Sequence, residues 1–91
     1  MTPEQLQADL TLGGWVPVQY VLDKGDVWKG LYKEGTGLVY VQTHGPIAGM
    51  PRYFPEWPVE DHRFVRELRC RWEDMTDHLR KFAEFIEEKG L

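Results

Sequence analysis

The hydrophobic positions of the chain predict a helix near each end. In residues 2–12, Leu6 and Leu10 lie one helical turn apart, behind a Thr2-Pro3 start typical of a helix N-terminus. In residues 60–89, apolar residues recur at alternating spacings of three and four, which predicts a long amphipathic helix. This apolar seam is Val65, Leu68, Trp72, Met75, Leu79, Phe82 and Ile86. Thr76 is a suitable N-cap, so the pattern leaves open whether this helix is continuous or broken there.

Between the helices, residues 15–43 predict three strands joined as an antiparallel meander. A three-residue loop with Gly25 in the left-handed position fits the first turn, and it pairs Tyr20 with Trp28. A two-residue turn at Gly35-Thr36 fits the second, and it pairs Gly30 with Val41. Together these registers predict one core face, made of Val16, Val18, Tyr20, Leu22, Trp28, Gly30, Tyr32, Val39 and Val41.

The predicted fold is α+β, in the order helix, three-stranded antiparallel meander, long helix, with both helices on one face of the sheet. Residues 44–59 form a connection whose four prolines exclude a helix or a central strand. We expect Gly30, in the middle of the sheet, to let a large side chain such as Trp72 approach closely. All of residues 1–91 form a single domain.

Composition excludes several classes of protein. A chain of 91 residues with 42% hydrophobic and 29% charged residues is globular, and it is too short for two ordinary cores. The single cysteine, Cys70, excludes an intramolecular disulfide and a cysteine-based zinc site, and favours the cytoplasm. No secretory signal or run of about 20 apolar residues is present, so we expect no membrane association. The net charge of −4 makes nucleic acid an unfavourable default partner.

Candidate catalytic and metal-binding residues are few. His44, His62 and His78 lack a His-x-x-x-His spacing, although Asp74 and His78 lie one helical turn apart. Cys70 stands between two arginines, which would lower its thiol pKa. No carboxylate or nucleophile stands out from this pattern. We therefore expect no enzyme activity, cofactor or metal.

Two surfaces are candidates for binding another protein. The first is the proline-stiffened segment that carries Arg52, Tyr53, Phe54 and Trp57, since aromatics and arginine dominate interface hot spots. Its alternative role is a lid over the domain's own core. The second is the outer sheet face, with Trp15, Leu31 and Tyr40 as its large apolar members. Its alternative is scattered surface hydrophobics shielded by lysine stems.

A stripe of basic residues offers a different function. Arg63, Arg66 and Arg69 are spaced by three, so they line one face of the predicted helix and could contact RNA or DNA phosphates. Acidic residues interleave with them, and the alternative is a solvated, salt-bridged helix face.

The helix–three strands–helix order, with Gly14-Trp15 entering the first strand, resembles the double-stranded RNA-binding fold and HicA-like toxins. The resemblance implies no site residues. The toxin histidine has no counterpart in residues 1–43, and the Lys-Lys-x-Ala-Ala motif of the RNA-binding domains is absent. Fold likeness alone does not give function.

The sequence thus predicts a small non-catalytic protein-interaction module, homodimeric or bound to another protein. An accessory or inhibitory protein of a phage or mobile element would have this size and charge. The alternatives are a nucleic-acid-binding domain that uses the arginine stripe, and a small-molecule binder with a pocket between the aromatic segment and the C-terminal helix.

Overall fold

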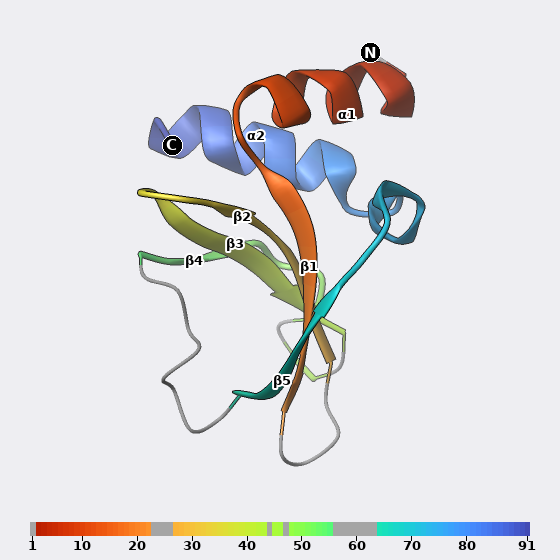
Figure 1. The fold of residues 1–91 in the computed structure, drawn as a ribbon, viewed down its shortest axis with the longest axis vertical. Coiled ribbons are helices and arrows are strands. Elements are labelled where there is room, and N and C mark those ends of the chain that lie inside the picture. Colours follow the sequence, from red (N-terminus) through yellow and green to blue (C-terminus); the bar gives the residue numbers. More distant parts are fainter. Residues whose placement is uncertain (1, 23–26, 44, 47, 56–63) are drawn as a thin grey trace.

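The fold consists of two helices packed on a five-stranded antiparallel sheet (Figure 1). The computed structural model describes residues 2–22, 27–43, 45–46, 48–55 and 64–91. Its elements are α1 (Pro3–Leu12), β1 (Val16–Leu22), β2 (Val27–Lys33), β3 (Gly37–Gln42), β4 (Arg52–Phe54), β5 (Phe64–Arg69), the 3₁₀ helix η2 (Trp72–Met75) and α2 (Leu79–Lys89). The strand order is β4-β3-β2-β1-β5. The α+β class is confirmed, and the sheet has two strands beyond the predicted three.

Helix α1 begins and ends as the sequence predicts. The Thr2 hydroxyl accepts a hydrogen bond from the Gln5 N–H, and the Gln5 side-chain oxygen accepts one from the Thr2 N–H. This capping box satisfies backbone donors that the first helical turn leaves free. At the other end, Gly14 has a φ of 94°, and the Trp15 N–H donates to the Leu10 carbonyl at 3.0 Å. The chain therefore folds back, and Trp15 lies beneath its own helix.

The predicted register of β1 against β2 is confirmed, since Val16 pairs with Tyr32, Val18 with Gly30 and Tyr20 with Trp28. The predicted register of β2 against β3 is wrong by one residue. Gly30 pairs with Tyr40 rather than Val41, because three residues, Glu34 to Thr36, join Lys33 to Gly37. The turn is closed by the Thr36 N–H bonding to the Lys33 carbonyl, with Gly35 at a φ of 81°.

This one-residue shift exchanges the two faces of β3 and corrects the predicted core face. The face covered by the helices forms one core, the helix-face core, which comprises Leu10, Trp15, Leu31, Val39, Val41, Met75, Leu79 and Phe82. The opposite face holds a second buried cluster, which comprises Val18, Tyr20, Trp28, Leu38 and Tyr40. Of the predicted core-face residues, Val39 and Val41 belong to the first core, whereas Val18, Tyr20 and Trp28 belong to the second.

The predicted helix over residues 60–89 is wrong in its first half. Phe64–Arg69 form β5, which pairs antiparallel with β1 and gives hydrogen-bond partners to a strand that would otherwise be an edge. The 3₁₀ helix η2 follows, and the Thr76 hydroxyl donates to the Glu73 carbonyl rather than capping a new helix. The second half of the seam holds, because Met75, Leu79 and Phe82 are buried in the helix-face core.

A strand also forms within the predicted connection. Arg52–Phe54 make the short edge strand β4, which pairs with Leu38 to Tyr40 of β3. Pro51 and Pro55 flank β4. Proline has no backbone N–H to donate, and this is tolerated at the edge of a sheet, where one side of the strand has no neighbouring strand. Gly37 allows the close approach, since a side chain there would lie 2.4 Å from the Phe54 carbonyl oxygen.

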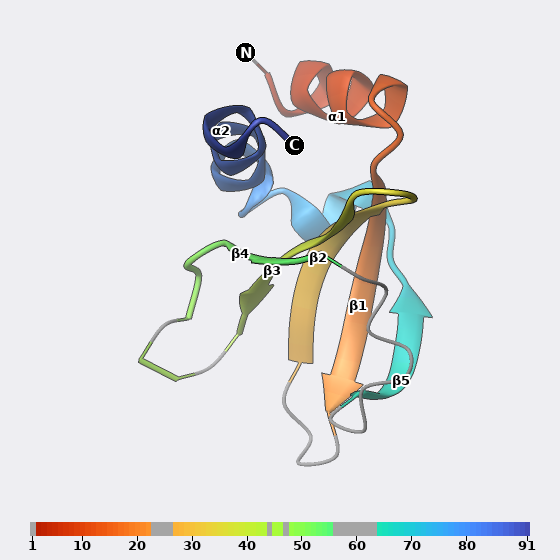
Figure 2. The ribbon, with the colours of Figure 1, turned by 90° about the vertical axis from the view of Figure 1, so that its left-hand side faces the viewer.

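The helices form one layer and the sheet the other. Figure 1 shows α1 and α2 side by side across one end of the sheet, and Figure 2 shows the strands extending away beneath them. Helix α2 packs through Leu79 and Phe82, and η2 closes the layer through Met75. Trp72 is half-buried at the margin of the same core.

Gly30 permits the close approach of another residue, but that residue comes from β3 and is not Trp72, which the sequence suggests. A β-carbon on Gly30 would lie 2.4 Å from the Val39 carbonyl oxygen and 3.0 Å from Cα of Tyr40. Tyr40, across the strand pair, stacks on Trp28 with ring centroids 4.5 Å apart and an interplanar angle of 6°. The glycine therefore makes room for β3 itself and for this aromatic pair, and not for Trp72.

We predict that Gly30→Ala lowers the free energy of unfolding by about 2–3 kcal/mol, because the added methyl group meets backbone atoms that cannot move aside. Urea unfolding followed by circular dichroism measures this change. Gly35→Ala is the control: its site has open space, and its φ of 81° costs only about 1–2 kcal/mol. A Gly30→Ala variant as stable as Gly35→Ala would contradict the steric argument.

Candidate functional site

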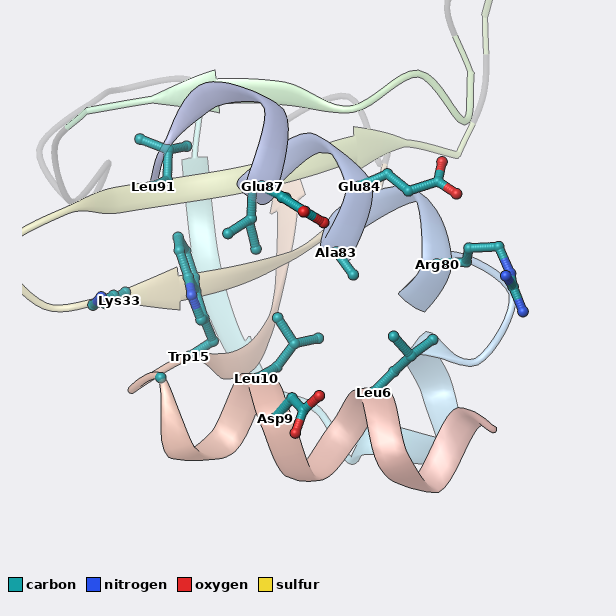
Figure 3. Close-up of a pocket in the computed structure, with 12 residues that line it drawn as sticks. Leu6, Asp9, Leu10, Trp15, Lys33, Arg80, Ala83, Glu84, Glu87 and Leu91 are labelled. Carbon is teal, nitrogen blue, oxygen red and sulfur yellow. The ribbon is translucent and has the colours of Figure 1, made fainter. Parts of the chain in front are cut away.

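A groove lies between α1 and α2. It has a volume of about 480 Å³, within the usual range of about 300–1,000 Å³ for ligand sites. Its apolar lining comes from both helices and the start of β1 (Figure 3), and comprises Leu6, Leu10, Trp15, Ala83, Ile86 and Leu91. Charged residues at its margin are Asp9, Lys33, Arg80, Glu84 and Glu87.

The turn after α1 creates the groove. Leu6 and Leu10 face the gap from α1, and Trp15 stands between the start of β1 and α2 (Figure 3). The Lys33 ammonium lies 5.9 Å from the centre of the Trp15 ring, which is within range of a cation–π contact. Trp15 lines one end of the gap, and the short side chain of Ala83 faces it from α2.

The charged side chains around the groove differ in direction. Glu87 points from α2 into the gap, and Asp9 stands opposite on α1 (Figure 3). Arg80 extends away from the gap in the same view, whereas the Lys33 side chain lies beside the Trp15 ring at the margin of the groove. The margin of the groove therefore carries charges of both signs, with Lys33 close to the Trp15 ring.

A second surface lies along the edge of the sheet, over residues 49–53. The Lys81 ammonium donates to the Gly49 carbonyl at 3.3 Å, and the Tyr53 hydroxyl donates to the Thr36 carbonyl. These bonds tie the segment to α2 and to the β2–β3 turn. Met50 and Tyr53 nevertheless remain 58% and 38% exposed.

A shallow depression of about 210 Å³ adjoins this segment, lined by Pro51, Lys81, Glu84, Phe85 and Glu88. It lies between the aromatic segment and α2, where the sequence suggests a small-molecule pocket. Its volume is below the usual range for ligand sites.

The predicted binding residues divide into three groups. Arg52 and Tyr53 are exposed on β4, and Phe54 is half-buried against the second cluster. Phe54 therefore anchors this part of the segment to the sheet, while Arg52 and Tyr53 remain accessible to a partner. Trp57 lies outside the described residues. The outer-face patch is wrong, because Trp15, Leu31 and Tyr40 are only 3%, 0% and 6% exposed and belong to the two cores.

The geometric basis of the arginine stripe is lost as well. Arg66 and Arg69 lie on β5, opposite Val21 and Val18 of β1, and Arg63 lies outside the described residues. A spacing of three aligns residues along a helix, but along a strand it places successive members on alternate faces. The arginines therefore do not form the predicted helical stripe.

Within the described ranges, no group of three or more histidine, cysteine or acidic residues could hold a metal ion. His44 and His62 lie outside those ranges. Asp74 has a structural partner, since its carboxylate accepts the Arg71 N–H at 3.1 Å at the start of η2. No helix in the described part of the chain is long and apolar enough to cross a membrane.

Comparison with known proteins gives no relative for this chain, since no family model, no curated protein and no solved structure matches it. The binding surfaces are therefore judged by their own geometry. Sequence reasoning missed the α1–α2 groove, although Leu6, Leu10 and Ile86 were visible as apolar helix positions. Its signal was the Gly13-Gly14 pair, which turns Trp15 back beneath α1.

Cys70 is half-buried beside Gln19, Lys29 and Asp74. Its sulfur lies 3.7 Å from the Gln19 side-chain oxygen. Burial raises the pKa of the thiol above its ordinary value, the Asp74 carboxylate raises it further, and the Lys29 ammonium lowers it. The net upward shift opposes the activation by arginines that the sequence suggests.

We predict that iodoacetamide alkylates Cys70 more slowly in the folded protein than in urea, and with a pH midpoint above that of a free thiol, because the thiolate reacts. Mass spectrometry over a pH series follows the reaction. Asp74→Asn should lower the midpoint and Lys29→Gln should raise it. A folded thiol that reacts as a thiolate near neutral pH would contradict this assignment.

His78 stands at the start of α2, and its ring centroid lies 6.1 Å from that of Phe82. Its Nδ1 is buried and has no hydrogen-bond partner among the described residues. Burial lowers the pKa of His78, Lys81 and Lys29 lower it further, and Asp77 opposes them. The folded protein therefore favours the neutral imidazole.

This shift predicts a loss of stability in acid. Because the folded pKa lies below the unfolded value of about 6.5, the contribution is complete above that pH and declines as the pH falls through the folded pKa. Thermal unfolding between pH 8 and 5 tests it against His78→Gln, which removes the titrating ring. As the pH falls from 8 to 5, the Tm of the wild type should decrease more than the Tm of His78→Gln. Parallel plots of Tm against pH for the two proteins would contradict the role of His78.

Proposed function

We propose that this protein is a small, non-catalytic protein-interaction module that forms a homodimer through the edge surface of residues 49–53 and α2. The observation that carries the proposal is the exposure of Met50 and Tyr53 on a segment fixed at both sides by hydrogen bonds. Preorganised aromatic and apolar side chains bind with a small entropy cost. This surface also contains Arg52, which the sequence singled out for the same role.

The charges of this surface support a self-complementary contact. Arg52 is exposed beside Pro51, and Glu84 and Glu88 line the adjacent depression with Lys81. In a twofold dimer each copy both offers and receives the same pair, so Arg52 of each protomer can face Glu88 of its partner. Backbone pairing between two β4 strands is less suitable, because β4 is short and flanked by prolines.

We predict that Arg52→Glu and Glu88→Lys each weaken the dimer at least about tenfold, because each places like charges across both copies of the pair. Sedimentation velocity over a concentration series measures the dissociation constant. An equal mixture of the two variants should regain association, since the heterodimer restores opposite charges at both contacts.

Val16→Thr is the matched control, since Val16 is also 38% exposed but lies on β1. It should leave the dissociation constant unchanged. A wild-type protein that stays monomeric throughout the series would contradict the homodimer. A dimer that both charge variants leave intact would place the interface elsewhere.

A further inference from the structure

The methionines of this chain differ in their access to solvent. Met75 of η2 is enclosed in the helix-face core with 0% of its surface exposed, whereas Met50 in the edge surface is 58% exposed. Met1 lies outside the described residues. A thioether is oxidised readily only where the oxidant can reach the sulfur. In the folded subunit an oxidant therefore reaches Met50 and not Met75.

The backbone around Met50 is constrained. The Gly49 N–H donates to the Gln42 carbonyl at 3.0 Å, and the Gly49 carbonyl accepts from the Lys81 ammonium at 3.3 Å. Gly49 has a φ of 78°, which favours glycine, and Pro51 follows with the restricted φ of its ring. The exposure of Met50 is therefore a property of a fixed segment.

Oxidation changes what this segment offers to a second copy of the chain. A thioether packs as an apolar group, whereas its sulfoxide is polar and carries an oxygen that accepts hydrogen bonds. Two donors of the edge surface are already engaged, since Lys81 binds the Gly49 carbonyl and Arg52 faces Glu88 of the second copy in the proposed dimer. Burying the sulfoxide oxygen without a donor opposes association.

We propose that Met50 is an oxidation site whose sulfoxide dissociates the edge-surface homodimer, an inference that rests on the dimer proposed above. With hydrogen peroxide as the oxidant, a lone pair of the Met50 sulfur attacks one peroxide oxygen and the O–O bond breaks. The sulfur is oxidised to the sulfoxide, and the peroxide is reduced and leaves as water after a proton shift. Association covers Met50, so free subunits are oxidised faster than dimers.

Peroxide treatment of the full-length protein tests this assignment. Peptide mass spectrometry locates the added oxygen, and sedimentation velocity gives the dissociation constant before and after treatment. Met50 should be oxidised at least about tenfold faster than Met75, and more slowly as the protein concentration rises through the dissociation constant. Oxidised Met50 should weaken the dimer at least about tenfold, as the loss of one interface hot spot does. Methionine sulfoxide reductases for both epimers, supplied with dithiothreitol, should restore association.

Two variants separate oxidation of Met50 from other effects of peroxide. Met50→Leu keeps an apolar side chain of similar size that cannot be oxidised, so its dimer should withstand the same treatment. This variant retains Cys70 and Met75, and it therefore reports any effect of oxidation at those residues. Met50→Gln places a polar group at the same position and should weaken the dimer at least about tenfold without peroxide. Circular dichroism of each sample shows that the fold is retained.

The outcomes distinguish a failure of this inference from a failure of the dimer. A dimer that survives complete oxidation of Met50, or that dissociates equally in Met50→Leu, would overturn the oxidation site alone. Equal oxidation rates at Met50 and Met75 would overturn it as well. A wild type that is monomeric before peroxide is added would contradict the edge-surface dimer and this inference with it. A Met50 rate that is independent of concentration, in a protein that does dimerise, would place the interface elsewhere and overturn both proposals.

Discussion

The burial of β3 on both faces is the constraint on which the rest of the structure depends. Val39 and Val41 face the helices, and Leu38 and Tyr40 face the opposite cluster. The strand therefore joins two cores, and its position is fixed by Tyr40, which fits over Gly30 and stacks on Trp28. Strand β4 is attached to the other side of β3, so the edge surface also takes its place from this strand.

The same burial explains why the sequence predicted one register and missed the other. The loop predicted at Gly25 lies outside the described residues, but the pairing of Tyr20 with Trp28 that it implies is correct. Strand β3 is apolar at every position from Leu38 to Val41, so hydrophobic alternation cannot distinguish two registers one residue apart. The choice between the two registers then depended on the β2–β3 turn, where Gly35 and Gly37 allow a loop of two or of three residues.

The misassigned helix has a related cause. Apolar spacings of three and four occur in residues 65–86, but Val65 and Leu68 are also compatible with a short strand. Pairing with β1 satisfies a row of backbone groups that a helix would have left at the sheet edge. Local pattern predicted the part that packs on apolar side chains, from Met75 to Ile86. Residues 64–69 are a strand because of long-range hydrogen bonds to β1, which the local sequence pattern does not reveal. For this reason the sequence placed the arginines on a helix instead of a strand.

The candidate surfaces follow from how the sheet is used. Because side chains on both of its faces are enclosed, Trp15, Leu31 and Tyr40 contribute to folding and are unsuitable for recognition. Binding can then occur at the margins, where α1 meets α2 and where the segment before β4 is tied to its neighbours. The existence of two cores explains why Trp15, Trp28 and Tyr40 are all buried.

The two-sided sheet also limits how this protein can change over evolutionary time. Side chains of β2 and β3 are divided between the two cores and pack against neighbours on the adjacent strand. We therefore expect the sequences of these strands to change slowly. The groove margin and the segment around Met50 carry exposed side chains whose replacement leaves both cores intact. A lineage could therefore exchange one partner for another by altering helix surfaces and the sheet edge, while the central strands stay nearly constant.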